Sequence, residues 1–255
     1  MTGVTEDLKG RVAIVTGANS GIGRAIAQDF AAAGAIVAIA GRNREGIRRV
    51  ADEIAAAGGR GVAFDYNAPV EEEADRLVGA VAAQLGEPVI CVANAGGTVG
   101  GTAPLCDMTT EMWRATLTLN LDAPFYLYRA VARRLIAAGL GGSLIGISSV
   151  ASVRAVPSLH YSAAKGGLNA MTINLSAQLG KHGIRVNAIL PGPVETPSFQ
   201  AGMTQEAREA MLRRVPLKRV GAPDEIAGLA RFLASDASSY VTGQLIVADG
   251  GMIQT

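Results

Sequence analysis

Short apolar runs alternate with segments of helical spacing along the whole 255-residue chain. The runs are continuously apolar instead of alternating between apolar and polar residues, which is typical of strands buried on both faces of a parallel sheet. No linker, internal repeat or change of composition interrupts this order. The sequence therefore predicts one doubly wound α/β domain that spans residues 1–255.

The expected elements follow one another as strand and helix. Strands are expected at residues 11–16, 36–40, 61–65, 88–93, 142–149, 184–190 and 245–248. Helices are expected at residues 24–33, 45–57, 69–85, 110–138, 158–179, 205–214 and 223–234.

Composition argues against several classes of protein. The net charge is +1, from 23 basic and 22 acidic residues, so the basic surplus of a nucleic-acid or anionic-membrane binder is missing. The only cysteines, Cys91 and Cys106, form no C-x-x-C pair, and neither a disulfide framework nor a metal site is expected. The N-terminus lacks a signal-peptide pattern, and no apolar run reaches the roughly 18 residues of a membrane span. We expect a cytoplasmic protein without nucleic-acid or membrane partners.

A glycine-rich turn follows the first expected strand. Gly17, Gly21 and Gly23 have the spacing G-x-x-x-G-x-G and lead into a helix whose first N–H groups can bind a pyrophosphate. In a doubly wound sheet, ligands bind outside the carboxyl ends of the strands, where this turn lies. Such a turn can also serve packing alone, and by itself it favours neither role. Its place in the first βαβ unit favours dinucleotide binding.

The segment after the second strand bears on which dinucleotide binds. No acidic residue stands in Ala40-Gly41-Arg42-Asn43 to accept hydrogen bonds from a ribose 2′-hydroxyl, as in NAD sites. Gly41 leaves space, and the Arg42 guanidinium suits a 2′-phosphate. We expect NADP(H) to be preferred, with NAD(H) possible; the alternative is that Arg42 is a solvated cation.

Tyr161 and Lys165 stand four residues apart at the start of an expected helix, so they share one face. An ammonium about 4 Å from a phenol favours the phenolate by roughly 4 kcal/mol at an effective dielectric constant of about 20. We therefore expect a lowered Tyr161 pKa and a role in proton transfer near neutral pH. The preceding strand ends on two hydroxyl groups, those of Ser148 and Ser149.

Taken together, these motifs resemble the classical short-chain dehydrogenase/reductase family, near its 3-oxoacyl-acyl-carrier-protein reductase-like branch. The resemblance covers essentially the whole chain and depends on the order and spacing of the motifs. They are Thr16-Gly17-x-x-x-Gly21-x-Gly23, Asn94-Ala95-Gly96, Asn120, Ser148-Ser149, Tyr161-x-x-x-Lys165, Asn187-x-x-x-Pro191-Gly192, Thr196, Gly221-Ala-Pro-Asp-Glu, Val241-Thr-Gly and Asp249-Gly-Gly. The resemblance implies a Rossmann-type three-layer sandwich with a seven-stranded parallel sheet. It also implies an NAD(P)(H)-dependent oxidoreductase that interconverts a carbonyl and a secondary alcohol by hydride transfer.

Residue roles are implied by the same resemblance. Tyr161 is the expected acid/base, Lys165 lowers its pKa and binds the nicotinamide ribose, and Asn120 holds a water of a proton relay. A serine binds the substrate oxygen. The expected cofactor-binding residues are Gly17, Asn19, Ser20, Gly21, Ile22, Gly23, Arg42, Asp65, Tyr66, Asn94, Ala95, Gly96, Tyr161, Lys165, Pro191, Gly192, Val194 and Thr196.

The identity of the catalytic serine stays open between two neighbours. Alignment along the strand selects Ser149, whereas the family's usual separation of thirteen from the tyrosine selects Ser148. We prefer Ser149, because a loop absorbs a deletion more readily than a buried strand absorbs a shift that turns its side chains over.

The substrate is not specified by these motifs. Residues 97–101, 151–159 and 193–215 are the expected substrate walls, with Arg154 in the second and an apolar lid of Phe199, Met203 and Met211 in the third. A 3-oxoacyl group on acyl carrier protein is an alternative to a small carbonyl or alcohol. A non-catalytic nucleotide-binding sensor or scaffold is the alternative of another class.

The family resemblance also implies an assembly. Its two long central helices pair between subunits, so we expect a homotetramer. The second of these helices carries apolar residues at helical spacing, more than one sheet face is expected to bury. They are Leu168, Met171, Leu175 and Leu179.

Overall fold

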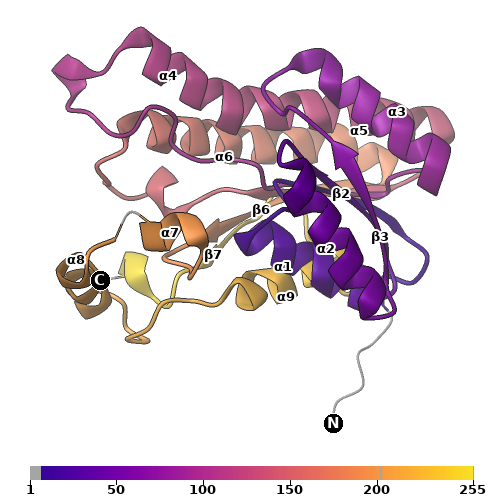
Figure 1. Ribbon diagram of the computed structural model, residues 1–255. Coiled ribbons are helices and arrows are strands. Elements are labelled where there is room, and N and C mark those ends of the chain that lie inside the picture. The colour runs from indigo at the N-terminus through magenta and orange to yellow at the C-terminus, as the bar shows by residue number, and fades with distance from the viewer. Residues whose placement is uncertain (1–6, 202, 255) are drawn as a thin grey trace.

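The computed structural model describes residues 7–201 and 203–254. One sheet of seven parallel strands lies between two layers of helices (Figure 1). Its strands, in the spatial order β3-β2-β1-β4-β5-β6-β7, are β1 (Val12–Thr16), β2 (Ile36–Gly41), β3 (Arg60–Asp65), β4 (Ile90–Ala93), β5 (Gly142–Ile147), β6 (Ile184–Pro191) and β7 (Leu245–Ala248). The predicted α/β sandwich with a seven-stranded parallel sheet is confirmed.

Helices cover both faces of this sheet and bury its apolar residues in two core clusters. The first face carries α1 (Gly21–Ala32), α2 (Arg44–Ala56) and α9 (Pro223–Ala234). The second face carries α3 (Glu71–Leu85), α5 (Ala123–Ala138) and α6 (Leu159–Leu179), with α4 (Thr110–Leu117) packed on α6. Two short helices, α7 (Pro197–Ala201) and α8 (Gln205–Arg213), follow β6. No described helix is both long and apolar enough to cross a membrane.

The strand order reverses between β1 and its neighbour β4, because β2 and β3 continue on one side and β5 to β7 on the other. A crevice opens at the carboxyl ends of strands at such a switch point. The loops that follow β1, β4, β5 and β6 therefore converge on one place.

The single helix expected at residues 110–138 is wrong in one respect. A π-helical turn, Thr118–Asp122, separates α4 from α5. Pro124 explains part of this break, since it has no N–H to donate to the carbonyl of Asn120, four residues earlier. The Asn120 side chain supports the wider turn by donating from Nδ2 to the carbonyls of Thr116 and Gly97, each at 2.8 Å. Single π-turns within α-helices often occur at functional sites.

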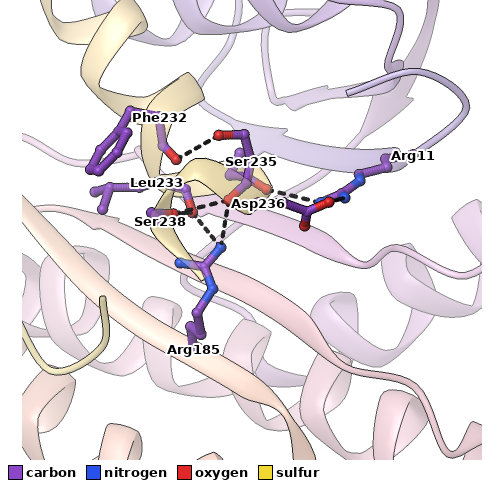
Figure 2. Close-up of polar contacts among 8 residues, drawn as sticks. Arg11, Arg185, Phe232, Leu233, Ser235, Asp236 and Ser238 are labelled. Carbon is purple, nitrogen blue, oxygen red and sulfur yellow. Dashed lines mark hydrogen bonds and ion pairs between the residues drawn. The ribbon is translucent and has the colours of Figure 1, made fainter. Parts of the chain in front are cut away.

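At the amino ends of the strands, two arginines bind the segment where α9 ends (Figure 2). Arg185 at the start of β6 donates to the carbonyls of Leu233 and Ser235, at 2.8 and 3.2 Å, where α9 ends. The carbonyl end of a helix favours a cation. Arg11 binds the carboxylate of Asp236 at 2.5 Å beside it. These contacts fix α9 against the sheet far from the carboxyl ends of the strands.

Candidate active site

A cavity of about 550 Å³ lies at the carboxyl ends of the central strands. It runs from Arg42 and Tyr66, which follow β2 and β3, to Tyr161 and Lys165 on α6. Its other lining residues are Gly17, Asn19, Ser20, Gly21, Ile22, Gly23, Gly41, Asn43, Ala68, Asn94, Ala95, Gly96, Gly97, Leu119, Ile147, Ser148, Ser149, Pro191, Gly192, Pro193, Val194, Thr196, Pro197, Ser198 and Phe199. The cavity therefore brings the glycine-rich turn and the Tyr–Lys pair into one site.

The glycine-rich turn presents the amino end of α1 to this cavity. The Ser20 side chain does not accept a hydrogen bond from the first turn of the helix, so the first N–H groups remain available to a ligand. A Cβ on Gly23 would lie 2.4 Å from Nδ2 of Asn94 and 2.5 Å from the carbonyl oxygen of Gly17. Only glycine lets the helix sit this close to the loop after β4.

Asn94 links the two central strands. Its Nδ2 donates to the Thr16 carbonyl at 2.8 Å, and its backbone N–H donates to the Thr16 hydroxyl at 3.0 Å. Because Thr16 ends β1 and Asn94 follows β4, these bonds hold the glycine-rich turn beside the Asn94-Ala95-Gly96 segment. Asn94 thereby steadies the two strands at the centre of the sheet.

Tyr161, Lys165 and Ser149 converge at the other end of the cavity. The Ser149 hydroxyl lies close enough to the Tyr161 phenol to act on its pKa. The Lys165 Nζ lies 5.5 Å from the centroid of the Tyr161 ring and donates to the Ile147 carbonyl at 2.7 Å. A hydroxyl, a phenol and a buried ammonium thus surround the place where a substrate oxygen would bind.

The predicted lowering of the Tyr161 pKa is wrong for this structure. Burial raises the pKa of Tyr161, and the nearby Ser149 hydroxyl opposes this shift only in part. Burial also lowers the pKa of Lys165 to about 8. The four-residue spacing accounts only for the attraction of a nearby ammonium, whereas the desolvation of both groups dominates in the folded chain. Tyr161 is therefore a protonated phenol at neutral pH, which suits a proton donor.

The two candidate serines have different surroundings. The Ser148 hydroxyl is buried, donates to Oδ1 of Asn169 at 2.7 Å, and lies 3.3 Å from the Lys165 carbonyl oxygen. The Ser149 hydroxyl contacts Tyr161 and accepts a bond from the Ala151 N–H at 3.1 Å. Ser149, the residue preferred from the sequence, is the one beside the phenol.

Asn120 is fully buried and does not itself line the described cavity. Its Oδ1 accepts from the Gly97 N–H at 3.0 Å, so the π-turn holds the loop after β4. A Cβ on Gly96 would lie 2.7 Å from Oδ1 of Asn120 and 3.2 Å from Nζ of Lys165. Asn120 therefore packs directly behind the Lys165 end of the site.

At the far end of the cavity, the side chains that follow β2 and β3 differ in whether they are free to bind a ligand. Arg42 is exposed and makes no hydrogen bond or ion pair with any residue that the structure describes. Asp65 does not line the described cavity, because its carboxylate binds Arg44, whose Nε lies 2.9 Å away. The Tyr66 side chain is buried in the core, and its hydroxyl has no partner among the described residues. Tyr66 can therefore offer a ligand its backbone but not its hydroxyl.

Known proteins resemble the chain over nearly its full length. Residues 17–253 match the family described as enoyl-(acyl carrier protein) reductase. The L-rhamnose 1-dehydrogenase (NAD(P)(+)) of Azotobacter vinelandii is 38% identical over 248 residues, which cover 95% of this chain and 96% of the relative. The 3-oxoacyl-acyl-carrier-protein reductase of Thermotoga maritima is 36% identical over 247 residues, which cover 96% and 99%. A crystal structure of a short-chain type dehydrogenase/reductase from Mycobacterium marinum aligns with a TM-score of 0.92 at 33% identity and covers 97% of each chain. The chain belongs to the short-chain dehydrogenase/reductase family.

As a short-chain dehydrogenase/reductase, the protein is an oxidoreductase that acts on CH–OH donors with NAD(P). All the residues predicted to bind cofactor line the cavity except Asp65, and all the predicted catalytic residues line it except Asn120. The predicted substrate walls are only partly correct. Of residues 97–101 only Gly97 lines the described cavity, and none of residues 151–159 does, so Arg154 lies outside it.

The structure adds cavity residues that the sequence motifs did not single out. Leu119 and Ala68 have no motif around them, and Ser198 lies in the variable segment after β6. Phe199 lines the cavity as predicted, but Met203 and Met211 are not among its described lining residues. Catalytic residues can be recognised from motifs of fixed spacing in the sequence, whereas residues that merely line a cavity belong to no such motif.

Proposed function

We propose that this short-chain dehydrogenase/reductase interconverts a carbonyl and a secondary alcohol with NADP(H) preferred over NAD(H), and that Tyr161 is the acid/base. The observation that carries the proposal is that Tyr161, Ser149 and Lys165 line the same cavity as the uncapped amino end of α1. The site fits a dinucleotide, because the glycine-rich turn lets a pyrophosphate approach and the cavity continues from there to Tyr161.

The roles of the residues follow from what a carbonyl needs during reduction. The bound nicotinamide supplies the hydride, or accepts it in the reverse direction. The Ser149 hydroxyl donates a hydrogen bond to the substrate oxygen as negative charge develops there. Tyr161 gives that oxygen its phenolic proton, which burial keeps in place at neutral pH.

Lys165 and Asn120 act behind the phenol. When Tyr161 has released its proton, the Lys165 ammonium stabilises the phenolate that remains. Lys165 must be charged to do so, and its pKa of about 8 keeps it largely charged at neutral pH. The Asn120 carbonyl has no N–H partner at Pro124, so it can hold the relay water through which the phenol regains a proton.

NADP(H) preference rests on Arg42. Its guanidinium is exposed at the cavity, has no partner among the described residues, and suits a 2′-phosphate. We expect Arg42→Ala to weaken NADPH binding, measured by fluorescence titration, by at least about tenfold and NADH binding by less than twofold. Equal changes for the two cofactors would contradict this preference.

The reaction is tested by a cofactor-consumption screen with NADPH and NADH. The panel contains ketones, keto acids, the lactone and sugar pair related to L-rhamnose, and a 3-oxoacyl group on acyl carrier protein. Turnover of a small carbonyl or alcohol that Tyr161→Phe abolishes, while NADPH binding persists, supports the proposal. Turnover of the carrier-bound substrate alone would favour the 3-oxoacyl reductase, the activity named for the Thermotoga maritima relative. Tight NADPH binding without turnover on any substrate would favour a non-catalytic sensor.

We also propose a homotetramer, although the apolar residues expected from the sequence to be left over for subunit contacts pack within the chain itself. Leu168 is fully buried, and Met171, Leu175 and Leu179 pack against the core of the same chain. The helices of that layer instead expose other large apolar side chains, namely Phe125, Ile136, Leu159 and Ile173. A monomeric mass by light scattering would refute the tetramer.

A further inference from the structure

Glu195 stands at the base of the segment that leaves the sheet after β6. A parallel bridge joins Val194 to Gly221, and the Glu195 N–H donates to the Gly221 carbonyl at 2.8 Å. The chain therefore leaves the sheet after Val194 and returns to it at Gly221, and the segment between them, called the excursion here, carries α7 and α8. The backbone of Glu195 is fixed on the sheet side of the excursion.

The carboxylate of Glu195 binds both helices of the excursion. Arg208 on α8 donates to it through both terminal nitrogens, at 3.1 Å to Oε1 and 2.5 Å to Oε2. Gln200 on α7 donates to Oε1 at 3.0 Å. The side chains of Glu195 and Arg208 are only about one-third exposed, 32% and 33%, and a bidentate pair of this kind has a defined geometry.

Phe199 lies between this ion pair and the cavity. The Arg208 guanidinium carbon lies 5.9 Å from the centroid of the Phe199 ring, within the range of a cation–π contact. The Phe199 N–H donates to the Thr196 hydroxyl at 3.2 Å, and both residues line the cavity that holds Tyr161. One side of the ring thus faces a cation fixed by Glu195, while the ring itself forms part of the cavity wall.

We infer that the Glu195–Arg208 ion pair is a positioning device that holds Phe199 at the cavity wall and thereby sets the size of substrate that reaches Tyr161. This inference rests on the proposed function, since it assigns a specificity determinant to the same site. Neither charged residue touches the reacting atoms; both act through the aromatic ring.

The test uses Arg208→Gln and the smallest and bulkiest substrates that the wild-type enzyme turns over. Loss of the ordered wall is expected to raise KM for the small substrate about tenfold, to change kcat less than about threefold, and to raise KM for the bulky substrate much less. The dissociation constant of NADPH is expected to stay within about twofold, because the backbone bond of Glu195 to Gly221 remains. Arg208→Lys keeps the positive charge but cannot form the bidentate contact, so its KM for the small substrate is expected to lie between those of wild type and Arg208→Gln.

A matched control is the exposed ion pair between Arg134 on α5 and Glu87 after α3, which has two bonds of 2.7 Å and lies outside the described cavity. Arg134→Gln is expected to leave the ratio of the two KM values unchanged. A double-mutant cycle with Phe199→Ala separates positioning from general stabilisation, because Arg208→Gln should then change KM less than about twofold. Additive effects in the cycle, or a parallel rise in KM and in the NADPH dissociation constant, would overturn the inference.

Amide hydrogen exchange of residues 195–213 provides a second measurement that does not depend on turnover. Exchange is expected to accelerate in Arg208→Gln and not in Arg134→Gln. If the wild-type enzyme turned over no substrate, the proposed function would fail while the exchange experiment still decided whether the ion pair orders this segment. Unchanged exchange in Arg208→Gln would refute the positioning role directly.

Discussion

Replacing Lys165 by methionine tests the physical basis of the site, because the folded chain buries an ammonium there. Lys165 is 2% exposed, and burial lowers its pKa from 10.5 to about 8. Each pKa unit corresponds to about 1.4 kcal/mol, so holding this charge in the folded state at neutral pH costs about 3 kcal/mol. Methionine has a similar length and no charge, but it leaves the Ile147 carbonyl without its 2.7 Å donor, at a cost of about 1–3 kcal/mol.

The pH dependence isolates the contribution of the charge. Between the folded pKa of about 8 and the unfolded value of 10.5, the folded state binds fewer protons than the unfolded state, so the free energy of unfolding rises with pH. The stability of wild type relative to Lys165→Met is therefore expected to increase by about 2 kcal/mol between pH 7 and pH 9.5. All other titrating groups are common to both proteins and cancel in the difference.

Urea unfolding at matched protein concentration measures this difference at the two pH values. At pH 7 the variant should be as stable as wild type or more stable by up to about 2 kcal/mol, although it loses turnover. A difference between the two proteins that does not change with pH would show that Lys165 is not a desolvated ammonium. A raised pKa of Tyr161 would then be contradicted as well, because the same burial causes it.

Two further predictions concern the serines and the glycine-rich turn. Steady-state kinetics are expected to show that Ser149→Ala lowers kcat about 100-fold, because the substrate oxygen loses a hydrogen-bond donor. Ser148→Ala should keep kcat within a few-fold but lower the melting temperature in calorimetry, because Asn169 loses a buried donor. The reverse pattern would show that Ser148 is the substrate-binding hydroxyl. Gly23→Ala is expected to destabilise the fold by about 1–3 kcal/mol and to abolish NADPH binding, since its Cβ would meet backbone and the Asn94 amide. Gly79→Ala on α3, where a Cβ meets nothing within 4 Å, is the control and is expected to stabilise the protein by about 0.5–1 kcal/mol in urea unfolding; similar losses in both variants would contradict the close-approach argument.

Much of the site was predictable from the sequence because its signals are local. The glycine spacing of the first turn and the four-residue separation of Tyr161 and Lys165 depend only on the strand-to-helix turn and the helical repeat. The continuous apolar runs predicted a parallel sheet, and the switch point of that sheet brings those two local motifs into one cavity.

Other features depend on contacts between distant parts of the chain, and only the tertiary structure decided them. The Asp65 carboxylate, which was expected to lie at the cofactor, binds the guanidinium of Arg44, 21 residues earlier in the sequence. The π-turn at Asn120 needs the Gly97 carbonyl from the loop after β4. The position of Phe199 depends on Arg208, which is brought beside it by the Glu195 carboxylate.

The sequence by itself determined the sheet, the glycine-rich turn and the four-residue spacing of Tyr161 and Lys165, because periodicity and spacing act over a few residues. Tertiary structure decided the proton state of that pair. The pKa of Tyr161 and of Lys165 depends on how completely water is excluded by residues from several strands and loops, and burial there outweighs the attraction that spacing alone suggested. It also decided that Ser149, and not Ser148, lies beside the phenol, because the Ser148 hydroxyl donates to Asn169 on α6.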